Sequence, residues 1–208
     1  MSRPPPVDKR RMKLILASGS RTRSQILAAA GLAFVVDPAD IDERSIASPH
    51  IVIGASAEEL AALLAQEKSS AVGARHLNDL TLGADQTLVC EGRLLNKPTS
   101  LHEAREQLEF LSGKTHELHA ALCIVRRGQM MWSHVAHASL KMRPLSKEFL
   151  SHYIRQMGQN ATASVGGYQI EGLGIQLIED VRGDHFTILG MPLLPLLAYL
   201  RSIGHLPS

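Results

Sequence analysis

The strongest constraint on the fold is the alternation of apolar runs and helical spacing at the start of the chain. Residues 12–17, MKLILA, form a short apolar run typical of a buried strand. Apolar residues at helical spacing over 21–30 predict a helix that ends at Gly31. The run AFVVDPADID then predicts a second strand that ends at Pro38. A strand, a helix and a strand in this order favour an α/β fold.

The rest of the chain continues the mixture of strands and helices. Residues 81–98 predict a strand, a tight turn at Glu91-Gly92 and a short return strand, and residues 116–142 predict two long strands joined near Arg127-Gly128. Residues 40–53 hold three acids and a proline with little periodicity, and we expect a loop there. Further helices are expected over 57–72, 101–111, 146–157 and 193–203.

Composition narrows the class of protein. The 22 lysines and arginines nearly balance the 20 aspartates and glutamates, which excludes a general nucleic-acid binder. No apolar run approaches the roughly 20 residues that span a bilayer. Cys90 and Cys123 each lie in apolar segments and indicate buried thiols in a reducing compartment. We therefore expect a cytoplasmic protein with a disordered basic, proline-rich tail over residues 1–11 and a single domain over 12–208.

Asp85 is the most informative residue, because it stands in the middle of the apolar run TLGADQTLVC. Strand alternation puts Asp85 on one face and its neighbour Gln86 on the other. A buried carboxylate costs free energy unless it meets a cation, a hydrogen-bond network or a chemical task. A structural ion pair and a chemical role are both open at this position.

Three basic residues are candidates to stand near Asp85. Lys97 follows the return strand, so the hairpin can bring its ammonium to the same end of the sheet; Lys68 lies near the edge of the apolar face of the helix 57–72. Taken alone, each residue is better interpreted as a surface lysine. Arg23 follows Ser18 and Ser20 at a strand-to-helix turn, where backbone amides and hydroxyls favour an anion. Simple capping of the helix by Ser20 is the alternative.

An acidic cluster follows the second predicted strand. Asp40, Asp42 and Glu43 are consistent with a solvated loop. If this loop folds over the sheet, Glu43 and Asp85 can share a hard cation, because Mg²⁺ favours one or two carboxylates together with phosphate oxygens and water.

Seven segments, in order along the chain, resemble the Maf (septum-formation inhibitor-like) family of nucleoside triphosphate pyrophosphatases. The resemblance covers the chain from Met12 to about Tyr199. LILASGSRTRSQIL is similar to the family's S-x-S-P-R-R opening, and LGADQTLVCEGRLLNKP to its central ADTVV…G…KP motif. The other similar segments are DIDE, LAQEKS, LEFLSGKTHEL, GGYQIEG and LGIQLIEDVRGDHFTILGMPL.

This resemblance implies an activity and a site. The family hydrolyses a nucleoside triphosphate between the α and β phosphates with Mg²⁺ or Mn²⁺. Its fold is a mixed α/β fold, with an elongated sheet flanked by helices in two lobes around a deep cleft, and a homodimer is expected. By resemblance, catalysis falls on Asp85, Lys68 and Lys97, substrate binding on Ser18, Ser20, Thr22, Arg23, Gln86 and Glu171, and the metal on Glu43 and Asp85.

Three departures from the commonest family pattern bear on the substrate. The chain has Ser20-Arg21-Thr22-Arg23 for S-P-R-R, Asp85-Gln86 for Asp-Thr, and Ile170-Glu171-Gly172 for I-Q-G. The glutamine and glutamate resemble the branch that acts on 7-methyl-GTP rather than the branch that acts on dTTP and UTP. A pyrophosphatase for 7-methyl-GTP is therefore expected. The alternatives are an enzyme for dTTP or UTP and a non-catalytic nucleotide-binding regulator of cell division.

Overall fold

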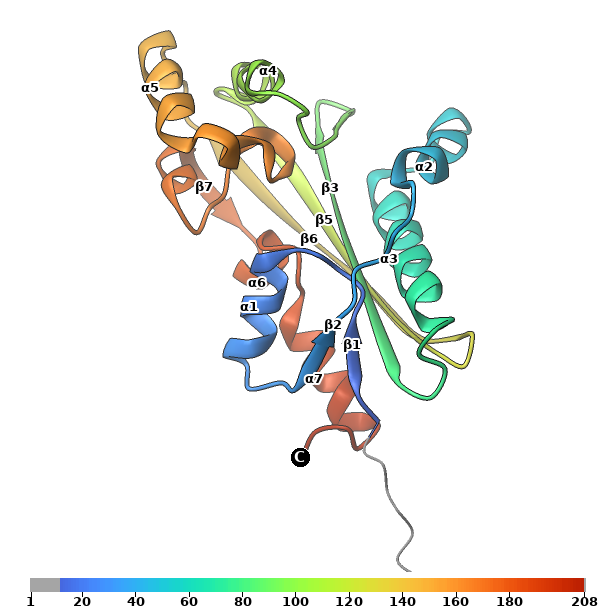
Figure 1. Cartoon of the computed structure of the whole chain (residues 1–208). Coiled ribbons are helices and arrows are strands. Elements are labelled where there is room, and N and C mark those ends of the chain that lie inside the picture. Colours follow the sequence, from blue (N-terminus) through green and yellow to red (C-terminus); the bar gives the residue numbers. More distant parts are fainter. Residues whose placement is uncertain (1–11, 208) are drawn as a thin grey trace, which may run out of the picture.

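The computed structural model describes residues 12–207, so the tail expected over residues 1–11 lies outside the described residues. The described residues form one mixed seven-stranded sheet in the order β2-β1-β3-β5-β6-β7, with β4 paired to β3 (Figure 1). β1 is parallel to both β2 and β3, and the other pairs are antiparallel. The strands are β1 (Leu14–Leu16), β2 (Phe34–Val36), β3 (Leu80–Cys90), β4 (Arg93–Leu95), β5 (Thr115–Arg126), β6 (Gln129–Met142) and β7 (Ile178–Arg182).

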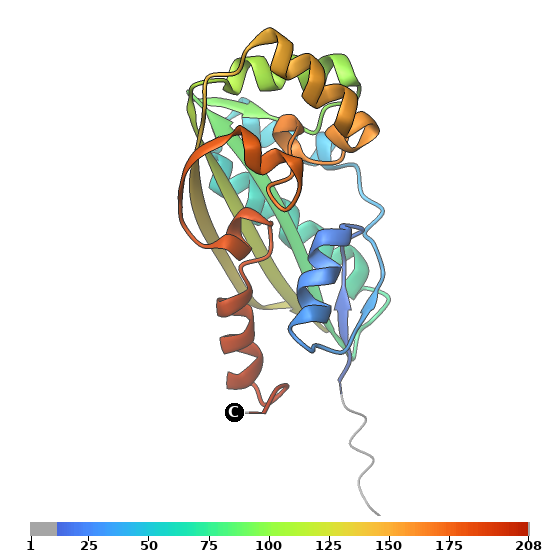
Figure 2. The same ribbon diagram turned by 90° about the vertical axis from the view of Figure 1, so that its left-hand side faces the viewer.

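Helices flank the sheet on both faces (Figures 1 and 2). α3 packs along one face, and the remaining long helices, apart from α2, lie over the other face, at its two ends. The α-helices are α1 (Arg21–Ala29), α2 (Glu43–Val52), α3 (Ala57–Gly73), α4 (Leu101–Leu111), α5 (Lys147–Met157), α6 (His185–Ile188) and α7 (Leu193–Ser202). Short 3₁₀ turns cover Gly158–Thr162, Val165–Gly167 and Leu173–Leu177.

The core opposite α3 is divided into two clusters, which confirms the expected two lobes. Along β3, Leu82 and Ala84 belong to the cluster under α1 and α7, whereas Leu88 and Cys90 belong to the cluster under α4 and α5. These residues alternate on one face of the strand, and Gln86 stands between the two pairs. The polar residue thus marks the point where one lobe ends and the other begins.

β3 has an open edge between the two lobes. On this side β1 pairs with β3 only up to Leu82, and β4 pairs with β3 only from Leu88 onward. Within the described residues no strand pairs with β3 from Gly83 to Thr87 on this side. Side chains from both faces of β3 can therefore reach the same gap in the sheet.

The expected loop over 40–53 is wrong, because α2 occupies most of it. Asp42 caps this helix by accepting the backbone N–H of Ser45, and Glu43 adds a negative charge to the first turn. No side chain of α2 is buried, and Pro49 lies inside it. The helix therefore carries no apolar stripe, which is the pattern by which helices are recognised in a sequence.

Other expectations from the sequence are confirmed by the structure. Ser20 caps α1 by accepting the backbone N–H of Arg23. Both cysteines are buried free thiols. No helix within residues 12–207 is long and apolar enough to cross a membrane.

Candidate active site

A cavity of about 810 Å³ lies at the open edge of β3. Its walls come from the start of α1, from α2 and α3, from the segment after β4 and from the glycine-rich segment around residues 163–171. All the predicted site residues except Ser18 line this cavity: Ser20, Thr22, Arg23, Glu43, Lys68, Asp85, Gln86, Lys97 and Glu171. The structure thus brings together residues that the sequence spreads over 150 positions.

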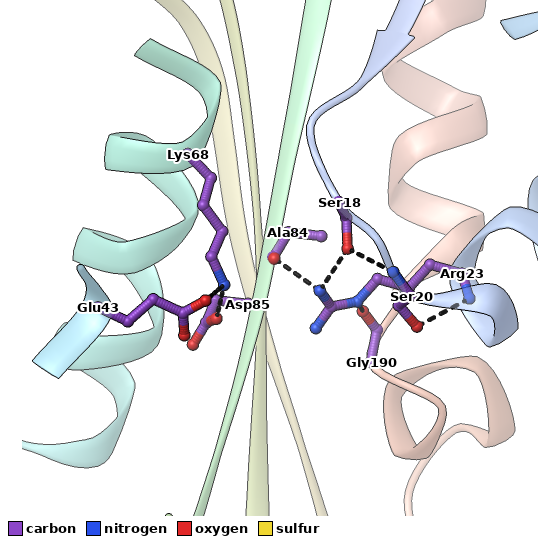
Figure 3. A network of polar contacts seen from close by, with 8 residues as sticks. All are labelled: Ser18, Ser20, Arg23, Glu43, Lys68, Ala84, Asp85 and Gly190. Carbon is purple, nitrogen blue, oxygen red and sulfur yellow. Dashed lines mark hydrogen bonds and ion pairs between the residues drawn. The ribbon is translucent and has the colours of Figure 1, made fainter. Parts of the chain in front are cut away.

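The centre of the site is an ammonium between two carboxylates. Lys68 Nζ lies 2.5 Å from Asp85 Oδ1 and 2.8 Å from Glu43 Oε1 (Figure 3). Lys68 and Asp85 are buried, whereas the Glu43 side chain is half exposed. Burial raises the pKa of Asp85, and the neighbouring Lys68 and Arg23 oppose this rise. Burial thus weakens the tendency of Asp85 to ionise, and the two cations restore part of it.

The guanidinium of Arg23 is fixed on the other side of β3 (Figure 3). Its Nη1 donates to the Ala84 carbonyl at 2.7 Å and to Ser18 Oγ at 3.0 Å, and its Nε donates to the Gly190 carbonyl at 3.0 Å. Burial lowers the pKa of Arg23, although a guanidinium stays charged in proteins. Ser18 therefore acts on the site through Arg23.

Gln86 ties the α6 segment to the sheet. Its amide nitrogen donates to the carbonyls of Thr187 and Ile188 at 3.1 and 3.0 Å. Both N–H groups of this amide are therefore engaged by the protein, and only its carbonyl oxygen is left to face a ligand. Asp85 and Gln86 lie on opposite faces of β3, which confirms the prediction from strand alternation.

A hydrogen bond joins the two lobes near the mouth of the cavity. Thr22 Oγ1 donates to Glu171 Oε1 at 2.9 Å, so the first turn of α1 contacts the glycine-rich segment. Lys97 lines the cavity from the segment after β4. Burial and, secondarily, the charge of Arg23 lower the pKa of Lys97, because both disfavour its ammonium. The predicted cations Arg23, Lys68 and Lys97 therefore line one cavity, together with Arg44.

The two carboxylates form an incomplete metal site by themselves. Within residues 12–207 there is no group of three histidine, cysteine or acidic residues that could hold a metal ion. Glu43 and Asp85 nevertheless point toward one another across Lys68 (Figure 3). Two carboxylates fit Mg²⁺ or Mn²⁺ when phosphate oxygens and water supply the other ligands.

Sequence reasoning missed parts of the site that depend on the backbone. The Gly190 carbonyl holds Arg23, and at this glycine φ is +74°, so a side chain there would strain the turn. Tyr168 lines the cavity, and its hydroxyl makes a 2.7 Å hydrogen bond with Nε2 of the buried His116. No side-chain pattern marks a carbonyl, but the glycine-rich composition around Tyr168 was a usable signal of close packing.

Comparisons with known proteins agree with the resemblance seen in the sequence. The family model described as "Maf-like protein" matches residues 13–203. A nucleoside triphosphate pyrophosphatase from Rhodopseudomonas palustris (strain HaA2) is 53% identical over 91% of this chain and 93% of its own length. A 7-methyl-GTP pyrophosphatase from Rhizobium etli is 45% identical over 92% of this chain and 96% of its own length.

Among solved structures, the chain is similar to a dITP/XTP pyrophosphatase from Mycobacterium abscessus. The TM-score is 0.42 and the identity 16%, with 94% of this chain and 98% of that chain covered. A likeness this distant says nothing about the site of this chain.

Proposed function

This chain belongs to the Maf-like protein family, and on that premise we propose that it hydrolyses nucleoside triphosphates between the α and β phosphates. Water and the triphosphate give a nucleoside monophosphate and pyrophosphate. The chain is thus a hydrolase acting on acid anhydrides, as the names of its relatives support.

One observation carries the proposal: three cations and a buried carboxylate surround a single cavity. Arg23, Lys68 and Lys97 face it together with Asp85. Phosphoryl transfer depends on positioning and on neutralising negative charge more than on a covalent nucleophile. These cations can contact the phosphate oxygens of a triphosphate, and Arg23 offers a guanidinium already held in place.

Asp85 is the proposed general base. A water oxygen forms a bond to phosphorus while the bridging P–O bond to the leaving group breaks, and the water proton passes to Asp85. A carboxylate whose pKa is raised by burial accepts a proton more readily than an exposed one. The Lys68 ammonium keeps Asp85 ionised before the reaction.

Glu43 and Asp85 are the residues that would hold Mg²⁺ or Mn²⁺. Their carboxylate oxygens are the ligands that these hard cations prefer. When bound, the ion would polarise the phosphate oxygens. Arg23 and Lys97 would orient the rest of the triphosphate.

The proposed substrate is 7-methyl-GTP. The Glu171 carboxylate lines the cavity at its mouth, where Thr22 engages only one of its oxygens. A carboxylate accepts hydrogen bonds from the N1–H and N2–H₂ edge of guanine and favours the positive charge of the N7-methylated ring. Some relatives at 45–47% identity carry the name 7-methyl-GTP pyrophosphatase, whereas others at 51–53% carry the generic name.

The test is pyrophosphate release from 7-methyl-GTP, GTP, dTTP, UTP and CTP with Mg²⁺. We expect 7-methyl-GTP to be preferred, Asp85→Asn to abolish turnover, and Glu171→Gln to weaken the use of 7-methyl-GTP selectively. A preference for dTTP or UTP would contradict 7-methyl-GTP as the substrate but would leave the proposed reaction unchanged. If the wild-type protein turns over none of these nucleotides, a non-catalytic regulator of cell division becomes the better hypothesis. The homodimer and the cytoplasmic location stay predictions.

A further inference from the structure

The ammonium of Lys68 occupies the place between two carboxylates that a divalent cation would need. It contacts Asp85 Oδ1 and Glu43 Oε1 at hydrogen-bond distance, and the three side chains come from three different elements (Figure 3). Lys68 is itself only 8% exposed. Lys68 and Asp85 therefore form a buried contact, which differs from an exposed surface ion pair, and Glu43 joins it from a half-exposed position on α2.

We propose that Lys68 is a stand-in cation, which holds Glu43 and Asp85 together in the nucleotide-free protein and excludes a free divalent metal until a triphosphate draws the ammonium away. This inference rests on the proposed function for the identity of the anion. It adds an order of events: the metal enters with the nucleotide and not before it.

Electrostatics make the two occupants mutually exclusive. An ammonium and a divalent ion bound to the same carboxylate oxygens would repel each other at a distance of a few ångströms. Because Asp85 is buried, water screens this repulsion only weakly on its side of the site. Without either cation, the buried Asp85 would face the like charge of Glu43 with no nearby cation between them, which disfavours ionisation of both carboxylates. The pair of carboxylates therefore needs one cation at a time.

A comparison with Arg23 explains why Lys68 is the cation that moves. Arg23 is held by three hydrogen bonds to Ser18, Ala84 and Gly190. Lys68 holds its position through the two carboxylates, and its ammonium ends a flexible four-carbon stem. Phosphate oxygens entering the cavity offer this ammonium an anion of higher charge than the carboxylates. The two carboxylates are then free to receive the metal.

The experiment is a titration of the nucleotide-free protein with Mn²⁺. The electron paramagnetic resonance signal of free Mn²⁺ measures how much of the ion stays unbound. Wild type is expected to bind Mn²⁺ weakly, and Lys68→Met is expected to bind it at least about tenfold more tightly, equivalent to about 1.4 kcal/mol. Lys68→Arg keeps a cation and should behave like wild type. Asp85→Asn combined with Lys68→Met should lose the gain. Inorganic tripolyphosphate should tighten Mn²⁺ binding to wild type more than to Lys68→Met.

Lys141→Met is the matched control, because Lys141 pairs with Glu179 on the surface at 3.0 Å. Equal Mn²⁺ affinity in wild type and Lys68→Met, or the same gain in Lys141→Met, would overturn the proposal. If Lys68→Met does not fold, Lys68→Gln tests the same loss of charge while keeping a hydrogen-bond donor. The titration needs no turnover, so a failure of the proposed function in the pyrophosphate assay remains a separate result.

Discussion

Gly83→Ala tests whether the close approach of α3 to β3 is what brings Lys68 to Asp85. A Cβ at Gly83 would lie 2.0 Å from the Ala65 carbonyl oxygen and 2.7 Å from the Ser69 backbone nitrogen. Ordinary contact begins at 3.4 Å, so the helix would have to retreat by about 1.4 Å. The retreat carries the backbone of Lys68 away from Asp85, so its flexible side chain must extend, or the 2.5 Å contact between Lys68 Nζ and Asp85 Oδ1 lengthens toward about 3.9 Å.

The expected loss of stability depends on which atom the new Cβ clashes with. Overpacking a core costs about 1–3 kcal/mol, and the Ala65 carbonyl belongs to the helix backbone and cannot rotate aside, so we expect about 3 kcal/mol. For a chain of this size that lowers the melting temperature by about 6–12 °C. Urea unfolding measures the change in the free energy of unfolding. Pyrophosphate release, at a temperature where the variant stays folded, measures the loss of kcat.

Gly73→Ala is the matched control, because Gly73 ends α3 and its Cβ would come closer than ordinary contact only to the Val125 side chain, at 3.2 Å. This variant should stay within about 1 kcal/mol of wild type. The reasoning is refuted if Gly83→Ala keeps wild-type stability and kcat, or if both variants lose them equally.

Three further predictions concern charge. Since burial raises the pKa of Asp85 in the nucleotide-free protein, the acid limb of the kcat/KM profile, which reports the free enzyme, should lie at higher pH than an ordinary aspartate would give; a limb near pH 4 would contradict a role as base. Arg23→Lys keeps the charge but loses the fixed hydrogen bonds, including the one to the Gly190 carbonyl, so KM for the nucleotide should rise by about tenfold; an unchanged KM would argue against a phosphate contact. Hydrogen bonds led by the one from Arg75 hold the pKa of Asp37 below its usual range, so its stabilising contribution is present at neutral pH and is lost as the pH falls through that depressed pKa. In urea unfolding, Asp37→Asn should therefore destabilise the protein more at pH 7 than near pH 2, and an equal effect at both would refute the linkage.

Much of the fold and site could be predicted because buried residues recur along the sequence with the period of a strand or a helix. Asp85 and Gln86 were assigned to opposite faces of a strand by alternation alone, and this prediction is confirmed. The interpretation of Lys68 as a surface lysine is wrong, because this residue is buried against Asp85. α2 was missed because none of its side chains is buried, so nothing in its spacing distinguishes it from a loop. The anchoring of Arg23 by the Gly190 carbonyl was missed because backbone groups are the same at every residue.

The neighbouring residues Asp85 and Gln86 of β3 contact different parts of the site, and this restricts the insertions and deletions that β3 can tolerate. Nine consecutive residue pairs, from Thr81↔Val125 to Val89↔Glu117, fix the register of β3 against β5. Inserting or deleting one residue before Asp85 within this stretch would exchange the faces of the carboxylate and its neighbour Gln86, and with them the contacts to Lys68 and to the α6 segment. Specificity can therefore diverge here only by substitution at constant length, whereas insertions can accumulate in the turn at Arg127-Gly128, at the far end of the same strands.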